Sequence, residues 1–189
     1  MSVDVRRTWT RADLAVLPDD GLRYELVDGS LVVTPPPAQR HHWWAHSLAV
    51  QLRAGAPDGW WVVTELSLPL GENLRIPDVV VHRWPLLSPE PDVDNPLGPQ
   101  DVGLLVEVVS PRTRTTDRFS KPGEYAAAGV GVFWRLETEP VPALHPYELV
   151  DGVYVAHAVI TGTGAAPSPW GEMVVELGGQ STALGNVRP

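Results

Sequence analysis

The sequence predicts a globular α/β (α+β) domain in which helices and strands alternate along the chain. Val102–Val109 is an apolar run, interrupted only by Glu107, with the length of a strand that is buried on both faces. Residues 38–54 carry apolar and aromatic side chains at the spacing of one helical face. Two Asp-Gly pairs, at 28–29 and 151–152, each lie between alternating runs, which is the pattern of a β-hairpin.

The length and composition predict one domain over residues 1–189, with a flexible C-terminal tail from about 178 to 189. An apolar content of 43% and a charged content of 20% are typical of a globular chain. Because the chain has no cysteine, disulfides, thiolate metal sites and cysteine nucleophiles are excluded.

The net charge and the hydropathy of the chain bear on whether nucleic acid or a membrane is a partner. The net charge of -9 disfavours a passive binder of nucleic acid, but disfavours a metal-dependent nuclease less, because bound divalent ions reverse the local field. The N-terminal residues include no apolar signal region, and no apolar run approaches the roughly 20 residues that span a bilayer. We therefore expect a cytoplasmic protein without a membrane partner.

The N-terminal half begins with a short helix at residues 10–17, which Thr10 and Asp13 cap. Its further predicted elements are a hairpin at 22–33, a break at the prolines 35–37, the helix at 38–54, and strands at 60–69 and 74–83. Pro77 lies inside the second of these strands, so an edge position, a bulge or a strand start is expected there. A proline-rich loop follows at 85–100.

The C-terminal half begins with the buried strand 102–109, and a polar stretch at 112–120 is either a loop or a short turn of helix. A helix is predicted at 122–128, with Pro122 in its first position. The remaining predictions are a strand at 130–136, a hairpin at 141–160, a flexible segment at 162–168 and a strand at 172–177.

Asp78 and Glu107 are carboxylates embedded in two separate apolar strands. Alternate residues of a strand share a face, so neighbouring strands could direct both carboxylates into one pocket. Two buried carboxylates side by side require a cation, and a hard divalent ion with oxygen ligands is the natural one. Lys121, the only lysine beside thirteen arginines, begins the next helix and could reach the same pocket.

This set of groups suits the hydrolysis of a phosphodiester. A metal would polarise the phosphate and lower the pKa of an attacking water. Lys121 would orient that water or offset the charge that develops on the phosphoryl oxygens. Glu25 would be a third carboxylate, which either binds the metal itself or acts as a base next to the metal ligands.

Each residue also has a structural alternative. Asp78 could belong to a bulge or turn after Pro77, Glu107 could pair with Arg135, and Lys121 could be solvated at the start of its helix. Glu25 could face solvent, since the same Tyr-Glu-Leu-Val-Asp-Gly sequence recurs around Glu148.

Two further patterns are weaker. His42 and His46 share a helix face, but Trp43 stands where a zinc motif of the His-Glu-x-x-His type needs its glutamate. Ser110 is not surrounded by the Gly-x-Ser-x-Gly sequence of a nucleophile elbow.

The order and spacing of several motifs are similar to those of a known family. The motifs are Tyr24 to Gly29, the Pro-rich turn before His42, Ile76-Pro-Asp78, Glu107 to Pro111, Asp117, Lys121, Tyr125, and Gly129 to Trp134. Over residues 10 to 160, which would form the core of the domain, the chain resembles the Uma2 family of putative restriction endonucleases, a branch of the PD-(D/E)XK nuclease superfamily.

The resemblance implies a restriction-endonuclease-like mixed central β-sheet flanked by helices, with N-terminal and C-terminal β-hairpins. It also implies a site for Mg²⁺ or Mn²⁺, in which Asp78 and Glu107 match the ligand carboxylates and Glu25 the N-terminal acidic residue. The superfamily's Glu-x-Lys lysine would fall at Val109, so Lys121 matches a lysine that is displaced onto the next helix.

The expected function is that of a metal-dependent endonuclease, with DNA favoured over RNA as the nucleic acid, working as a homodimer. The alternative is a catalytically inactive nuclease-fold module that binds another protein or nucleic acid. A hydrolase of small phosphoesters is a third, weaker interpretation.

Overall fold

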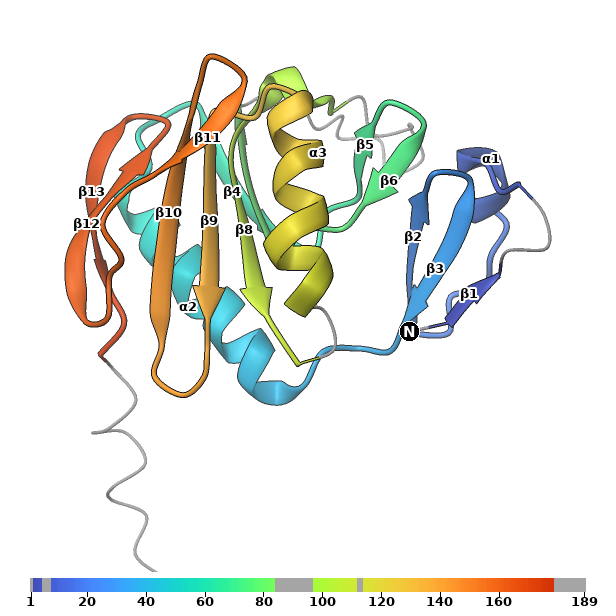
Figure 1. The fold of residues 1–189 in the computed structure, drawn as a ribbon, viewed down its shortest axis with the longest axis horizontal. Coiled ribbons are helices and arrows are strands. Elements are labelled where there is room, and N and C mark those ends of the chain that lie inside the picture. The colour runs from blue at the N-terminus through green and yellow to red at the C-terminus, as the bar shows by residue number, and fades with distance from the viewer. Residues whose placement is uncertain (1, 5–7, 84–96, 112–113, 179–189) are drawn as a thin grey trace, which may run out of the picture.

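The computed structural model describes residues 2–4, 8–83, 97–111 and 114–178. In this part of the chain, a six-stranded sheet forms the centre, a five-stranded sheet contains the N-terminal strands, and a two-stranded hairpin follows near the C-terminus. The predicted α+β fold, with a mixed central sheet and with hairpins toward both ends, is confirmed (Figure 1).

The central sheet has the strand order β11-β10-β9-β8-β7-β4. Its strands β8 and β9 are parallel, and all its other neighbours are antiparallel, so the sheet is mixed. The strands are β4 (Trp60–Thr64), β7 (Val79–Arg83), β8 (Val102–Val109), β9 (Val132–Glu137), β10 (Ala143–Val150) and β11 (Val153–Ala156).

Helices cover both faces of this sheet (Figure 1). The long helix α2 (Gln39–Gly55) buries Trp44, Leu48 and Leu52 in the larger apolar cluster, as its sequence spacing predicts. The shorter helix α3 (Lys121–Ala127) lies on the opposite face, where Tyr125 packs in the second cluster. The central strand β8 is buried on both faces, which explains why its sequence is apolar apart from Glu107.

The N-terminal sheet has the order β1-β3-β2-β6-β5 and is antiparallel throughout. Its strands are β1 (Ser2–Asp4), β2 (Arg23–Val27), β3 (Ser30–Thr34), β5 (Leu68–Leu70) and β6 (Asn73–Arg75), and the short helix α1 (Arg11–Leu14) precedes β2. The predicted turn at Asp28-Gly29 is confirmed, because both residues have positive φ, 49° and 73°.

The strands predicted at 60–69 and 74–83 are each interrupted, and this difference shapes the molecule. Trp60 pairs with Arg83 in the central sheet, whereas Leu68 pairs with Arg75 in the N-terminal sheet. Both pairs belong to one long hairpin, which changes sheets at residues 65–67 and 76–78. Glu65 has a φ of 56° and Pro77 has no N–H to donate, so regular pairing stops there.

The expected flexible segment at 162–168 is instead a strand. β12 (Thr163–Ser168) pairs with β13 (Gly171–Glu176), Ala166 is fully buried, and the indole of Trp134 donates a hydrogen bond to the carbonyl oxygen of Pro167 (2.9 Å). Its small residues and glycines suggested a loop, but their size lets the strand pack closely on the sheet.

The other predictions have mixed outcomes. Most of the expected 85–100 loop and residues 179–189 of the tail lie outside the described residues. The extent of the domain stays a prediction. None of the helices in the described part of the chain has the length and apolar character needed to cross a bilayer.

Candidate active site

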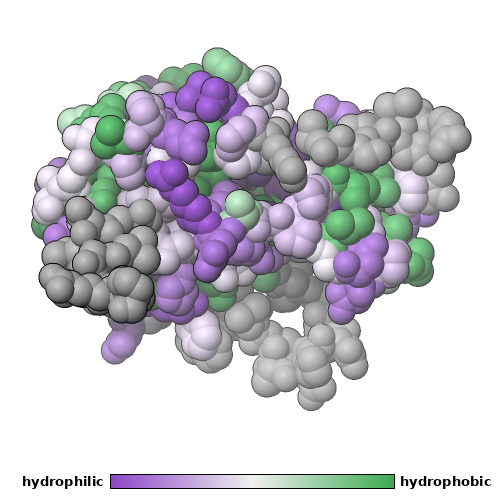
Figure 2. Space-filling view, turned by 90° about the horizontal axis from the view of Figure 1, so that it is seen from below, coloured by the Kyte–Doolittle hydropathy of each residue, from purple (hydrophilic) through white to green (hydrophobic). Residues whose placement is uncertain are grey.

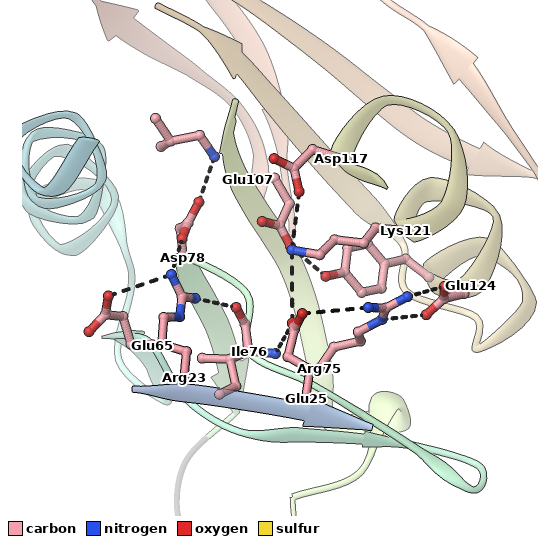
Figure 3. Close-up of polar contacts among 12 residues, drawn as sticks. Arg23, Glu25, Glu65, Arg75, Ile76, Asp78, Glu107, Asp117, Lys121 and Glu124 are labelled. Atoms are coloured by element: carbon pink, nitrogen blue, oxygen red, sulfur yellow. Dashed lines mark hydrogen bonds and ion pairs between the residues drawn. The ribbon is translucent and has the colours of Figure 1, made fainter. Parts of the chain in front are cut away.

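A pocket of about 460 Å³ lies between the two main sheets. Its walls come from the N-terminal sheet, the linker into α2, the central sheet, and the helical segment that begins at residue 114 and continues into α3. The lining residues are Arg23, Glu25, Thr34, Pro35, Pro36, Pro37, Ala38, His41, Asp78, Glu107, Ser110, Pro111, Asp117 and Lys121. All four sequence-predicted site residues are among them, and Figure 3 shows their side chains converging.

Asp78 and Glu107 come from adjacent antiparallel segments. Val79 pairs with Val106, and continuing this register places Asp78 opposite Glu107. Both carboxylates are buried, with 3% and 1% of the residue exposed. The backbone N–H of Val108 donates a hydrogen bond to Oδ2 of Asp78 (2.7 Å), which fixes this carboxylate against β8.

Two positively charged or chargeable side chains hold the other oxygen of Asp78. Nε2 of His41 lies 2.9 Å and Nη1 of Arg23 lies 3.3 Å from Oδ1. Arg23 also donates to the carbonyl oxygen of Ile76 (2.6 Å), so it links β2 to the interruption that carries Asp78. Burial raises the pKa of Asp78, but His41, Arg23 and Lys121 outweigh it and lower that pKa to about 2.

Lys121 is buried rather than solvated, with 5% of the residue exposed. Its Nζ lies 2.9 Å from Glu107, 3.2 Å from Asp117 and 4.0 Å from Glu25 (Figure 3). Burial lowers the pKa of Lys121, but these carboxylates and Asp78 raise it far more, so the side chain is a permanent cation.

The helix around Lys121 explains why Pro122 does not displace it. The polar stretch predicted as a loop or a short turn of helix is helical from residue 114, with a π-helical segment at Thr116–Ser120 that continues into α3. Pro122 follows the π-helical segment directly, where the regular α-helical hydrogen-bond ladder is already interrupted, so its missing N–H is tolerated. Asp117 and Lys121 are four residues apart, and both side chains turn into the pocket.

Glu107 has two partners on α3. The hydroxyl of Tyr125 donates a hydrogen bond to Oε1 (2.5 Å), and Lys121 contacts the same oxygen. Burial raises the pKa of Glu107 to about 8, despite the opposing charge of Lys121. Arg135 pairs with Glu107 in the sheet register, but its Nε contacts Glu137 (3.2 Å), so the alternative ion pair is not the one that forms.

The two copies of the Tyr-Glu-Leu-Val-Asp-Gly sequence place their glutamates in different surroundings. Oε1 of Glu25 accepts a hydrogen bond from the backbone N–H of Ile76 (2.9 Å), and Nη1 of Arg75 lies 3.5 Å from its Oε2. Glu25 is thus buried, whereas the side chain of Glu148 is 53% exposed and forms an ion pair with the partly exposed His157.

The sequence did not single out several residues that complete the pocket. Arg23 lies two positions before Glu25 on the same face of β2, so this spacing could have found it. Asp117, which the sequence marked only as part of the family resemblance, lies one helical turn before Lys121 and contacts it. His41 and the pair of Arg75 with Glu124 depend on long-range contacts and left no local signal.

The donor set has the chemistry of a site for Mg²⁺ or Mn²⁺, although it is not a complete cage. Among the described residues, no three His, Asp or Glu side chains stand close enough to hold a metal ion, and this includes the exposed His42 and His46. Mg²⁺ commonly takes only one or two carboxylates and keeps several waters. Asp78 and Glu107 meet that requirement, and the volume of the pocket leaves room for water and a phosphate.

Comparisons with known proteins identify the family of the chain. The model of the Uma2 family, described as putative restriction endonuclease, matches residues 11–170. The chain therefore belongs to the Uma2 family, and with it to a class of nuclease-like proteins.

A solved relative supports the same fold. The crystal structure of a putative nuclease from Anabaena variabilis superposes with a TM-score of 0.60 at 15% identity, over 80% of this chain and 84% of that one. At this identity the likeness concerns the fold alone. No curated protein matches the chain.

Proposed function

We propose that this chain is a divalent-metal-dependent endonuclease that hydrolyses phosphodiester bonds, with DNA as the favoured substrate. The observation that carries the proposal is the pair of buried carboxylates, Asp78 and Glu107, which face one pocket beside a buried ammonium. Membership of the Uma2 family supports a nucleic-acid substrate.

In this proposal Asp78 and Glu107 hold the metal, and Lys121 acts on the phosphate. Bound Mg²⁺ or Mn²⁺ would supply a Lewis acid for the phosphoryl oxygens and a water of lowered pKa. Val108, His41 and Arg23 fix Asp78, while Tyr125 fixes Glu107. Lys121 offers N–H donors to charge that develops on the phosphate, and Glu25 and Asp117 position that ammonium.

The surroundings of the pocket suit a charged substrate. The linker with Pro35–Pro37 forms one wall and crosses the lower side of the molecule between β3 and α2 (Figure 1). Seen from that side, the middle of the molecule is mainly hydrophilic, and hydrophobic residues gather over the N-terminal sheet (Figure 2). A phosphate backbone would therefore approach over polar rather than apolar surface.

Cleavage of supercoiled plasmid DNA by the full chain with Mn²⁺ tests the proposal. We expect cleavage that chelation abolishes and that Asp78→Asn and Glu107→Gln each reduce by about 100-fold or more, since each removes a ligand charge. Glu148→Gln is the matched control and should cut like the wild type. Neither DNA nor RNA being cut, with calorimetry showing no Mn²⁺ binding, would refute it.

One observation favours a second candidate, a nuclease-fold module that binds without cutting. The carboxylates of the pocket already contact protein cations, which are Lys121, Arg23 and Arg75. Such a module would bind oligonucleotide equally well with and without Mn²⁺, whereas the nuclease should require the metal for cleavage.

The homodimer stays a proposal. Cleavage of both strands of a duplex is readily achieved by two copies related by a two-fold axis. Sedimentation or light scattering of the full chain, with and without duplex DNA, measures whether its mass is that of one copy or two.

A further inference from the structure

The ammonium of Lys121 has the surroundings of a bound cation. Oxygens of Glu107, Asp117 and Glu25 lie 2.9, 3.2 and 4.0 Å from Nζ, and the three side chains are at most 11% exposed. Oxygen ligands from several carboxylates are also what hard divalent ions prefer. Lys121 therefore occupies a position that a metal ion could fill if the ammonium were absent and the carboxylates moved inward.

Asp78 is oriented differently from these three carboxylates. Its oxygens contact Val108, His41 and Arg23, whereas the ion pairs of Lys121 within the described residues are with Glu107, Asp117 and Glu25. Glu107 is the carboxylate that can serve both places, because it contacts Lys121 and lies opposite Asp78 in the sheet register. The pocket would thus offer two cation positions, one between Asp78 and Glu107 and one already taken by Lys121.

The formal charges lead to the same arrangement. Glu25, Asp78, Glu107 and Asp117 bring four negative charges to the pocket, and Arg23 and Lys121 return two positive ones. Arg75, which also contacts Glu25, leaves this balance unchanged, because its bidentate partner Glu124 adds one negative charge for its positive one. With all four carboxylates ionised, as binding of a metal ion to Glu107 would require, two negative charges remain, which is the charge that one divalent ion neutralises.

We propose that Lys121 is the built-in second cation of this site, so that the chain takes one divalent ion rather than two. The inference rests on the proposed function, because it specifies how many ions that site holds. It also assigns a reason for the only lysine of the chain, since a compact ammonium fits a carboxylate cage better than the planar guanidinium used elsewhere.

The number of Mn²⁺ ions bound by the full chain, from calorimetry and electron paramagnetic resonance, tests the inference. The wild type should bind one ion, and Lys121→Met, which keeps the side-chain length without the charge, should bind two. Lys121→Arg should bind one. The double variant Lys121→Met/Asp117→Asn should return to one, because the second cage loses a carboxylate.

Arg118→Met is the matched control. It removes a cation from the same helical segment but outside the pocket, where Glu137 keeps its contact with Arg135, so one ion should bind. Two ions in the wild type, or one in folded Lys121→Met, would overturn the inference and leave the nuclease proposal standing. Lys121→Met that stays unfolded at saturating Mn²⁺ would also overturn it, since an ion should replace the ammonium. No ion in the wild type would refute the proposed function itself.

Discussion

The two hairpins with the sequence Tyr-Glu-Leu-Val-Asp-Gly provide a matched pair of substitutions, Glu25→Gln and Glu148→Gln. Both glutamates stand three residues before an aspartate in the same turn conformation, with a φ of 49° at Asp28 and at Asp151. Local strand and turn preferences are therefore alike in the two places. Any difference in the loss of stability must come from the tertiary surroundings of the carboxylates.

Glu25→Gln keeps an acceptor for the N–H of Ile76 but removes the charge beside Arg75 and Lys121. Removing one member of a buried ion pair costs roughly 3–5 kcal/mol. Because these contacts are 3.5 and 4.0 Å long and one hydrogen bond survives, we expect a loss of about 2–3 kcal/mol. Glu148→Gln should cost about 0.5 kcal/mol or less, as for other exposed ion pairs.

Urea unfolding of the metal-free chain at neutral pH, followed by circular dichroism, measures both losses. The two variants should share the slope of the wild type and differ in midpoint. Equal losses for the two variants would refute the reasoning. They would mean that the charges around buried Glu25 stabilise the folded chain no more than the contacts of exposed Glu148 do.

Two further predictions concern single buried groups. Tyr125→Phe should destabilise the chain by about 1.5–3 kcal/mol, because the hydroxyl of Tyr125 donates a hydrogen bond to a carboxylate. Tyr154→Phe should cost only about 0.5–1.5 kcal/mol, because the hydroxyl of Tyr154 donates to the carbonyl oxygen of Val130. Equal losses in thermal or urea unfolding would contradict this prediction. Burial lowers the pKa of His82 from its ordinary 6.5, so below about that pH the unfolded chain binds a proton that the folded chain refuses, and stability falls as the pH falls. Between pH 7.5 and 5.5, the free energy of unfolding of His82→Asn should fall by less than that of the wild type, as measured by urea unfolding at each pH. If both proteins lose the same free energy over this range, His82 has an ordinary pKa in the folded chain.

Local patterns in the sequence were sufficient for much of the fold. The strand β8, the helix α2 and both Asp-Gly hairpins follow from apolar spacing and turn chemistry that act within a few residues. The interruption of the long hairpin was not predictable in the same way. Pro77 indicated an irregularity, but only the second sheet shows that the chain leaves one sheet there and enters another.

The candidate site was predictable where a charge stood out against an apolar strand, as for Asp78 and Glu107. It was not predictable where charges come together from distant segments. His41 and Arg23 reach Asp78 across 37 and 55 residues of chain, and each looks like an ordinary polar residue in its own element. Lys121 was conspicuous only because the rest of the chain uses arginine, and its burial depends on the π-helical segment before it.

The interrupted hairpin also makes the N-terminal sheet part of the site. Residues 75–78 contribute Arg75 and the N–H of Ile76 to Glu25, and two residues later they present Asp78 to the pocket. Arg75 continues this connection to α3 through its bidentate contact with Glu124, one turn beyond Lys121. A shift of the N-terminal sheet would therefore disturb Asp78 and the cage of Lys121 together, so the proposed nuclease would need both sheets in place to hold a metal ion and a phosphate in one geometry.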